Sequence, residues 1–193
     1  AKESNYRKEA DALGTLTVTA QSIVPDPDNP ESYKGVVIND PVDVPYDGQE
    51  HKWSPTVTDK ENNPLTVGTD YTVSYDKEDF TNVTGEITVT ITGIGNYTGT
   101  VTKTYQITPA PIKITTESGN KVYDGTPLTA PGKIDGLVDG EEVSFTVTGS
   151  QTNVGSSLNS YTLKWDKTAK ESNYRKEADA LGTLTVTAQS IVP

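Results

Sequence analysis

The sequence repeats part of itself without a single change. Residues 1–25 return letter for letter as residues 169–193, which sets a period of 168 residues. A period of this length exceeds one solenoid unit and fits one or two complete domains. The identity includes surface-type residues such as Lys2, Arg7 and Lys8, which packing alone does not require. The chain is therefore expected to be a piece of a tandem-repeat protein.

Short runs of alternating apolar and polar residues predict β-strands. In residues 85–93, Ile87, Val89 and Ile91 alternate with threonines, as in a strand with one buried face. Six more runs are expected to be strands: 71–75, 100–107, 112–115, 143–148, 161–165 and 183–187. Gly, Asn, Asp or Pro bounds each run, which is typical of small all-β domains. The charged stretch 170–181 has a thin apolar stripe and is expected to be a long loop, with a short helix as the alternative.

A weaker repeat lies inside the period. Pro45-Tyr-Asp-Gly48 corresponds to Val122-Tyr-Asp-Gly125, and Gly95-Asn-Tyr97 corresponds to Ser172-Asn-Tyr174. Two divergent modules of about half a period each fit this pattern. We expect residues 1–25 to be the closing strand of a preceding repeat plus the start of a linker, 26–109 the first β module and 110–193 the second. Prolines near residues 108–111 are expected to interrupt the strand ladder there.

The two identical segments are expected to lie in different environments. Residues 183–187 should complete the second module, whereas the module that residues 15–20 would complete precedes the sequence. That strand could pair with an exposed edge of its own chain, add to the sheet of a neighbour, or be disordered, and we favour pairing over disorder.

Composition argues against several functions. The chain has 16 basic and 27 acidic residues and a net charge of −11, so nucleic acid and anionic membranes are not expected partners. Cysteine is absent, which excludes disulfides, thiol catalysis and thiolate metal sites. His51 is the only histidine and lies in a charged stretch, where it is expected to be solvated. No carboxylate pair has a recognisable catalytic spacing, so we expect no enzyme and no cofactor.

The sequence offers three possible binding or cross-linking sites, and we favour a simpler role for the residues of each. Calcium could bind acidic residues of a solvated linker, namely Asp26, Asp28, Glu31, Asp40 and Asp43. An isopeptide bond could join a strand lysine to an asparagine, from among Lys103, Lys113, Lys121, Asn96, Asn153 and Asn173. Sugars could stack on aromatic residues, namely Trp53, Tyr6, Tyr33 and Tyr97.

The Tyr-Asp-Gly motif predicts a tight turn. Glycine tolerates positive φ, and aspartate can accept hydrogen bonds from nearby backbone amides. Tyr46 and Tyr123 are then expected to pack beside their turns and to use their hydroxyls in hydrogen bonds.

At these motifs, and in the run from Gly95 to Val101, the chain resembles the MBG and YDG-type repeat modules of bacterial surface proteins. The resemblance covers about residues 36–187; it departs from the pattern at Gln49–Trp53 in the first copy and at Arg175–Gly182 in the second. It implies a repeat region of a Gram-positive cell-surface or secreted adhesin-like protein, which is expected to be extracellular and attached to the cell wall through other regions.

Together, these features predict two tandem small all-β modules. We expect Ig-like β-sandwiches, with β-grasp-like modules as the alternative. The expected function is a stalk that projects a distal binding domain, with neighbouring repeats as partners. The alternative is that the repeats themselves bind host glycans or proteins.

Overall fold

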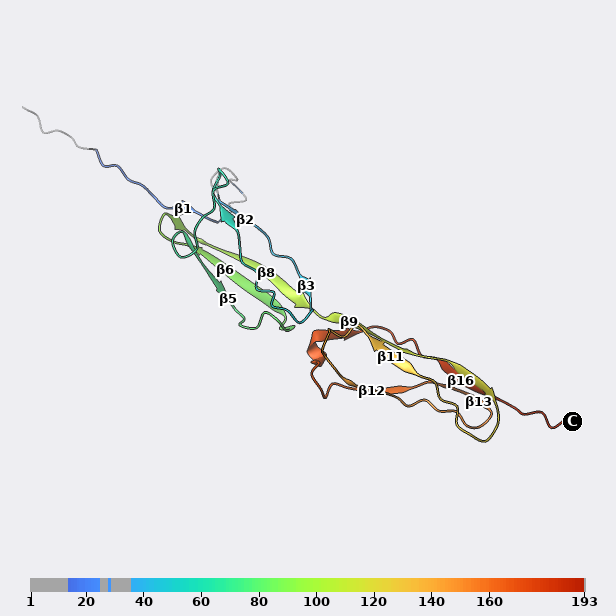
Figure 1. Cartoon of the computed structure of the whole chain (residues 1–193). Coiled ribbons are helices and arrows are strands. Elements are labelled where there is room, and N and C mark those ends of the chain that lie inside the picture. The colour runs from blue at the N-terminus through green and yellow to red at the C-terminus, as the bar shows by residue number, and fades with distance from the viewer. Residues whose placement is uncertain (1–13, 25–27, 29–35, 193) are drawn as a thin grey trace, which may run out of the picture. The chain divides into compact units, whose positions relative to one another are not determined.

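The computed structural model describes residues 14–24, 28 and 36–192 (Figure 1). These residues form β-strands and one short 3-10 helix, η2 (Glu171–Asn173), and none of them lies in an α-helix. The predicted all-β class is confirmed, while the Ig-like or β-grasp-like type stays a prediction. In the same ranges, no helix has the length and apolar character that crossing a membrane requires.

The strands up to residue 108 form three sheets. They are β1 (Gln21–Ser22), β2 (Val37–Ile38), β3 (Val44–Pro45), β4 (Val57–Thr58), β5 (Tyr71–Tyr75), β6 (Glu86–Gly93), β7 (Tyr97–Thr98) and β8 (Thr100–Thr108). The largest sheet has the order β3-β8-β6-β5, and β1-β7 and β2-β4 are separate pairs. Ile87, Val89 and Ile91 of β6 are fully buried, which confirms the predicted apolar face.

The strands from residue 110 onward also form three sheets. They are β9 (Ala110–Thr116), β10 (Gly119–Val122), β11 (Gly132–Asp135), β12 (Ser144–Val147), β13 (Gly155–Leu158), β14 (Tyr161–Lys164), β15 (Tyr174–Lys176) and β16 (Thr183–Thr187). Their orders are β10-β16-β13, β11-β9-β15 and β12-β14. Strand β16 is central, parallel to β10 and antiparallel to β13.

The chain divides into two compact units. The first contains residues up to 38, 56–73 and 90–101, and the second contains 39–55, 74–89 and 102 onward. In the described ranges, no sheet joins a strand up to β8 with a strand from β9 onward. The module borders at residues 26 and 110 stay a prediction, and β1 lies before the first of them.

One local expectation was wrong, and a second holds only in part. The charged stretch 170–181 is not only a loop, because it contains η2 and β15, and β15 pairs in parallel with β9, Tyr174 opposite Ala110. The burial of Tyr174 accounts for this strand despite its charged neighbours. The expected interruption of the ladder near residues 108–111 is found at Pro109, because β8 pairs with β3 and β6 whereas β9 pairs with β11 and β15. Pro111 itself lies inside β9, opposite Arg175.

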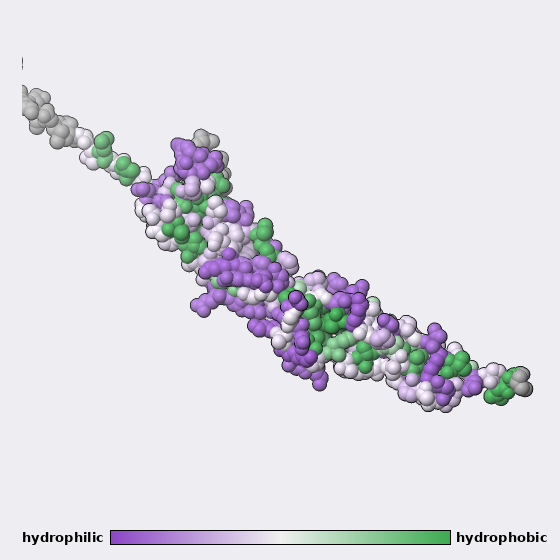
Figure 2. All heavy atoms as spheres, viewed as in Figure 1, coloured by the Kyte–Doolittle hydropathy of each residue, from purple (hydrophilic) through white to green (hydrophobic). Residues whose placement is uncertain are grey.

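The identical segments lie in different environments, as predicted. Leu16 is 99% exposed, whereas Leu184, the same residue one period later, is fully buried. The reverse holds further along, where Ile23 is 1% exposed and Ile191 is 97% exposed. Hydrophobic atoms accordingly project from the tails at both ends of the chain (Figure 2). Residues 15–20 form no strand and do not pair within this chain, where pairing begins at Gln21 in β1; pairing with a neighbouring chain stays a prediction.

The glycines of the two segments provide a matched test of this difference. A Cβ on Gly182 would lie 2.2 Å from the backbone carbon and oxygen of Glu117, whereas a Cβ on Gly14 would have no atom within 4 Å. We expect Gly182→Ala to lower the free energy of unfolding by about 1–3 kcal/mol through overpacking. Gly14→Ala should leave it nearly unchanged. The local sequence is the same at both sites, so effects on the unfolded chain cancel in denaturant titrations. Equal losses of unfolding free energy in the two variants would contradict the different environments of the two segments.

Candidate functional site

Both Tyr-Asp-Gly motifs form the same turn. Asp47 Oδ1 and Asp124 Oδ1 each accept the backbone N–H of the residue two positions later, at 2.9 Å in both cases. Gly48 and Gly125 have φ angles of 79° and 78°, which favour glycine. The predicted turn is confirmed in both copies.

The tyrosine of each motif is bonded to the end of a closing strand. The N–H of Tyr46 donates to the carbonyl of Thr108 at the end of β8, and that of Tyr123 donates to Thr187 at the end of β16, both at 2.8 Å. The preceding strands also match, since β3 is parallel to β8 and β10 is parallel to β16. The weak internal repeat therefore marks one local arrangement that occurs twice.

The two tyrosine side chains differ in what they contact. Tyr46 is 6% exposed and donates its hydroxyl to Glu141 Oε1, and Tyr174 donates its own hydroxyl to Glu141 Oε2 at 2.6 Å. The two rings meet edge to face, with centroids 5.5 Å apart and an interplanar angle of 83°. We call Tyr46, Glu141 and Tyr174 the tyrosine clamp. Tyr123, by contrast, is 39% exposed.

Packing on the far side of the clamp fixes Tyr174. Its hydroxyl also accepts the N–H of Val138 at 3.0 Å, and its ring stacks on Trp165 with centroids 5.4 Å apart. A Cβ on Gly48 would lie 3.1 Å from Val138 Cγ1, so the turn after Tyr46 packs closely against the same segment. The clamp thus joins residues on both sides of Pro109 within the second compact unit.

An asparagine pair adds polar contacts within this unit. Asn173 is 1% exposed; its Oδ1 accepts the N–H of Val83 at 2.9 Å and its Nδ2 donates to Asn82 Oδ1 at 2.8 Å. Asn82 in turn donates to Asp79 Oδ2 at 2.8 Å. A buried amide without partners would be costly, so these bonds specify how residues 82–83 meet residue 173.

The pKa values of both tyrosines in the clamp are raised. Burial is the main cause that raises the pKa of Tyr46 and of Tyr174, and the hydrogen bond to Glu141 raises both further. Both effects favour the neutral hydroxyl, the form that can donate to a carboxylate.

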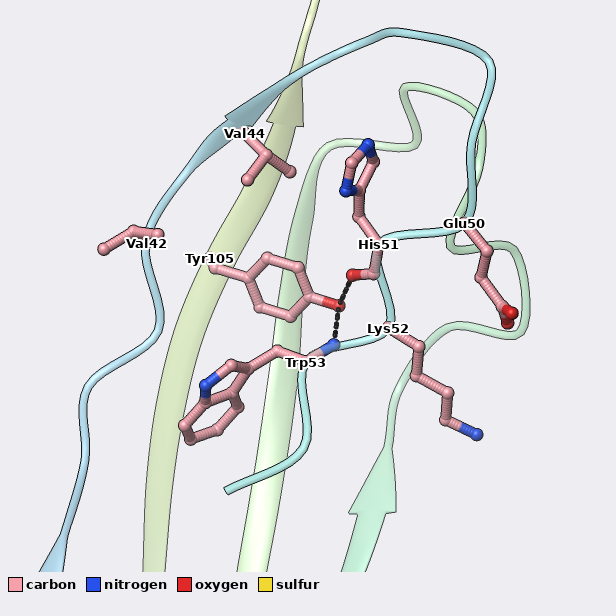
Figure 3. A pocket seen from close by; sticks show the side chains of 7 residues that line it. All are labelled: Val42, Val44, Glu50, His51, Lys52, Trp53 and Tyr105. Carbon is pink, nitrogen blue, oxygen red and sulfur yellow. Dashed lines mark hydrogen bonds between the residues drawn. The ribbon is translucent and has the colours of Figure 1, made fainter. Parts of the chain in front are cut away.

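A small pocket lies beside the loop that follows the first turn (Figure 3). It encloses about 320 Å³ and is lined by Val42, Val44, Glu50, His51, Lys52, Trp53 and Tyr105. The Tyr105 hydroxyl donates to the carbonyl of His51 at 2.8 Å and accepts the N–H of Trp53 at 3.1 Å. Because these bonds occupy the hydroxyl, its evident role is to hold the loop.

A larger and more polar groove lies along β14 and β15. It encloses about 770 Å³ and is lined by Tyr161, Leu163, Lys164, Trp165, Glu171, Tyr174 and Lys176. Tyr161 and Trp165 are not among the sugar-stacking residues that the sequence predicted. The missing signal was the pairing of β15 with β9, which the charged sequence of residues 170–181 did not reveal.

The predicted site residues remain mostly apart. His51 is not simply solvated, because its side chain is 24% exposed and bonds to Asp47 Oδ1 at 2.7 Å. Trp53 and Tyr97 are half-buried, and Tyr6 and Tyr33 lie outside the described residues.

The residues proposed for calcium do not form a cluster in the described ranges. Asp40 pairs with Lys103, and Asp43 accepts the N–H of Gln106 at 2.9 Å. No group of three or more potential metal ligands occurs among the described residues, which include Asp28 but neither Asp26 nor Glu31.

Several of the proposed isopeptide partners have other side-chain contacts. Lys121 bonds to Asp124 and to Thr126, and Asn173 belongs to the asparagine pair. Lys170 Nζ lies 3.3 Å from Asn82 Oδ1, but Lys170 is exposed, whereas this reaction requires a lysine shielded from water.

Comparison with known proteins gave no match, either to a family model or to a curated protein.

Removing one hydroxyl tests the clamp. We expect Tyr46→Phe to lower the free energy of unfolding by about 1–2 kcal/mol, because Glu141 loses a hydrogen bond at a buried contact. Tyr123→Phe is the matched control, since it changes the same motif where the ring is exposed, and should have little effect. The measurement is a urea titration of both variants. A loss of equal size in both would contradict a special role for Tyr46.

Alkaline pH should weaken the clamp. A tyrosine whose pKa is raised by folding stabilises the folded state fully below its unfolded pKa of about 10, and this stabilisation is lost as the pH rises further. Melting temperatures measured from pH 8 to pH 11 should therefore fall above about pH 10. The double variant Tyr46→Phe/Tyr174→Phe should start lower and fall less steeply. Parallel curves for the two proteins would refute the prediction.

Proposed function

We propose that this chain is a repeated spacer of an extracellular bacterial surface protein, in which packed joints between β modules limit bending. The observation that carries the proposal is the tyrosine clamp. It connects Tyr46, before the join at Pro109, with Glu141 and Tyr174 after it. The join itself is short, because one residue separates β8 from β9. A flexible tether would need neither feature.

The charge of the chain supports the same function. A net charge of −11 keeps neighbouring copies apart and disfavours adhesion to anionic surfaces. The absence of cysteine leaves stability to packing and hydrogen bonds such as those of Asn173. The resemblance to bacterial surface-protein repeats agrees with this function, and we propose an adhesin-like parent protein attached to a Gram-positive cell wall.

A second candidate function is binding of host glycans or proteins by the repeats. The groove along β14 and β15 favours it, because Trp165 and Tyr161 lie beside charged side chains, a combination that suits sugar stacking with hydrogen bonding. This support for binding is weaker than the support that the clamp gives to a spacer. Trp165 is already stacked on Tyr174, so one face of its ring is covered.

Binding to immobilised sugars separates the two functions. Beads that display many copies of the full chain would be applied to a glycan array and to mucin, so that avidity reveals weak binding. A spacer should stay at the background of uncoated beads. Binding that disappears with Trp165→Ala, but persists with Trp53→Ala as the matched control, would favour the second function and contradict the first.

A further inference from the structure

The repeated segment has two apolar parts, and each copy buries a different one. In the C-terminal copy, Leu184 and Val186 are buried while Ile191 is exposed. In the N-terminal copy, Leu16 and Val18 are 99% and 96% exposed while Ile23 is buried. One sequence therefore contains two binding elements, and each end of this chain shows one of them in use.

The first element is the strand seen as β16. It inserts between β10 and β13, with Leu184 opposite Gly119 and Ser157. Before the strand, Gly182 donates its N–H to Thr116 Oγ1 at 3.0 Å and accepts the N–H of Asn159 at 2.8 Å. The position fits this sequence closely, because Gly182 leaves no room for a Cβ.

The second element is the segment seen around β1. Gln21 donates its N–H to the carbonyl of Asn96 and Ile23 donates to Thr98, both at 2.9 Å, and β1 runs parallel to β7. Strand β9 begins in the same way, since Ala110 pairs in parallel with Tyr174 and Ile112 is 1% exposed. Thus β1 opens its group of strands as β9 opens the next.

The spacing between the two elements also matches. Pro109 is the single residue between β8 and β9, and Ala188 is the single residue between β16 and Gln189, the counterpart of Gln21. The closing strand β8 is therefore followed, after one residue, by the opening strand β9, and β16 is followed, after one residue, by the counterpart of β1, which forms no strand here. Tyr123 is exposed next to the end of β16, where its N–H donates to the carbonyl of Thr187.

We propose that the repeated segment is a connector that binds two copies of the 168-residue period at once. Its Thr-Leu-Thr-Val-Thr part fills the strand position between β10 and β13 of the preceding copy. Its Gln-Ser-Ile part pairs with β7 of the following copy. The partner that covers Leu16 and Val18 is thus a second copy of this chain's own period, not an unrelated protein. This inference holds whether the repeats act as spacers or bind a ligand.

The test uses the full chain with Leu184→Asp/Val186→Asp. The two carboxylates should expel the chain's own β16, whereas residues 15–19 stay intact. We expect the N-terminal segment of one molecule to enter the open position of another, as in strand complementation. Because this contact is head to tail and does not close, the mass measured by light scattering should rise from one chain to many with concentration. The wild-type chain should stay monomeric, since its own strand is tethered at high effective concentration.

Two controls identify the contact. Adding Leu16→Asp/Val18→Asp to that variant should return it to a monomer, and Leu16→Asp/Val18→Asp alone should match the wild type because both side chains are exposed. A peptide with the sequence of residues 14–25 should dissolve the assemblies, and the same peptide with aspartate at both apolar positions should not. Assemblies that persist in the fourfold variant would overturn the proposal.

If the substituted chains fail to fold, a second measurement tests whether the segment connects two copies of the period. In an extended chain, residues 26–193 are added again after Pro193, so that one segment has a period on each side. Pairing with β7 of the added copy should then slow the hydrogen exchange of the Gln189 and Ile191 amides to rates similar to those expected for Gln21 and Ile23. Rapid exchange at Gln189 and Ile191 in the extended chain would sink the proposal.

Discussion

The insertion of a closing strand into the middle of a sheet is the constraint on which the rest of this structure depends. Strand β8 lies between β3 and β6, and β16 lies between β10 and β13. A central strand satisfies the backbone groups of two neighbours, so each group of strands is complete only when the chain has returned to its last strand. The Tyr-Asp-Gly turns are tied to the same strands, because Tyr46 and Tyr123 bond to the residues where β8 and β16 end.

One local arrangement thus has two outcomes. After β8 the chain continues directly into β9, and Tyr46 is buried in the clamp with Glu141 and Tyr174. After β16 the corresponding Tyr123 is exposed. The backbone of the motif builds the turn, and the chain that follows it determines what the ring contacts. A repeat protein can in this way use one motif with a buried ring at one place and with an exposed ring at another.

A spacer and a binding module place different demands on such joints. A spacer needs joints that are short and packed, as at Pro109, and tolerates modest cores because each module is supported by its neighbours. A binding module needs free aromatic faces, yet Tyr105 and Tyr174 direct their hydroxyls to protein partners and Trp165 is covered by Tyr174. The use of aromatic residues in the described chain therefore suits cohesion better than recognition.

The sequence by itself determined several of the strands, both Tyr-Asp-Gly turns and the repetition. Alternation located β5 and β16 to the residue, and Asp-Gly located both turns, because these features depend on local backbone preferences and on one buried face. It also indicated that identical segments would differ in environment. Only the tertiary structure decided that Leu184 is buried while Leu16 is exposed, that β15 pairs with β9, and that Glu141 meets two tyrosines. These contacts join residues far apart in the chain, and no local pattern specifies which distant partner will cover an apolar or polar side chain.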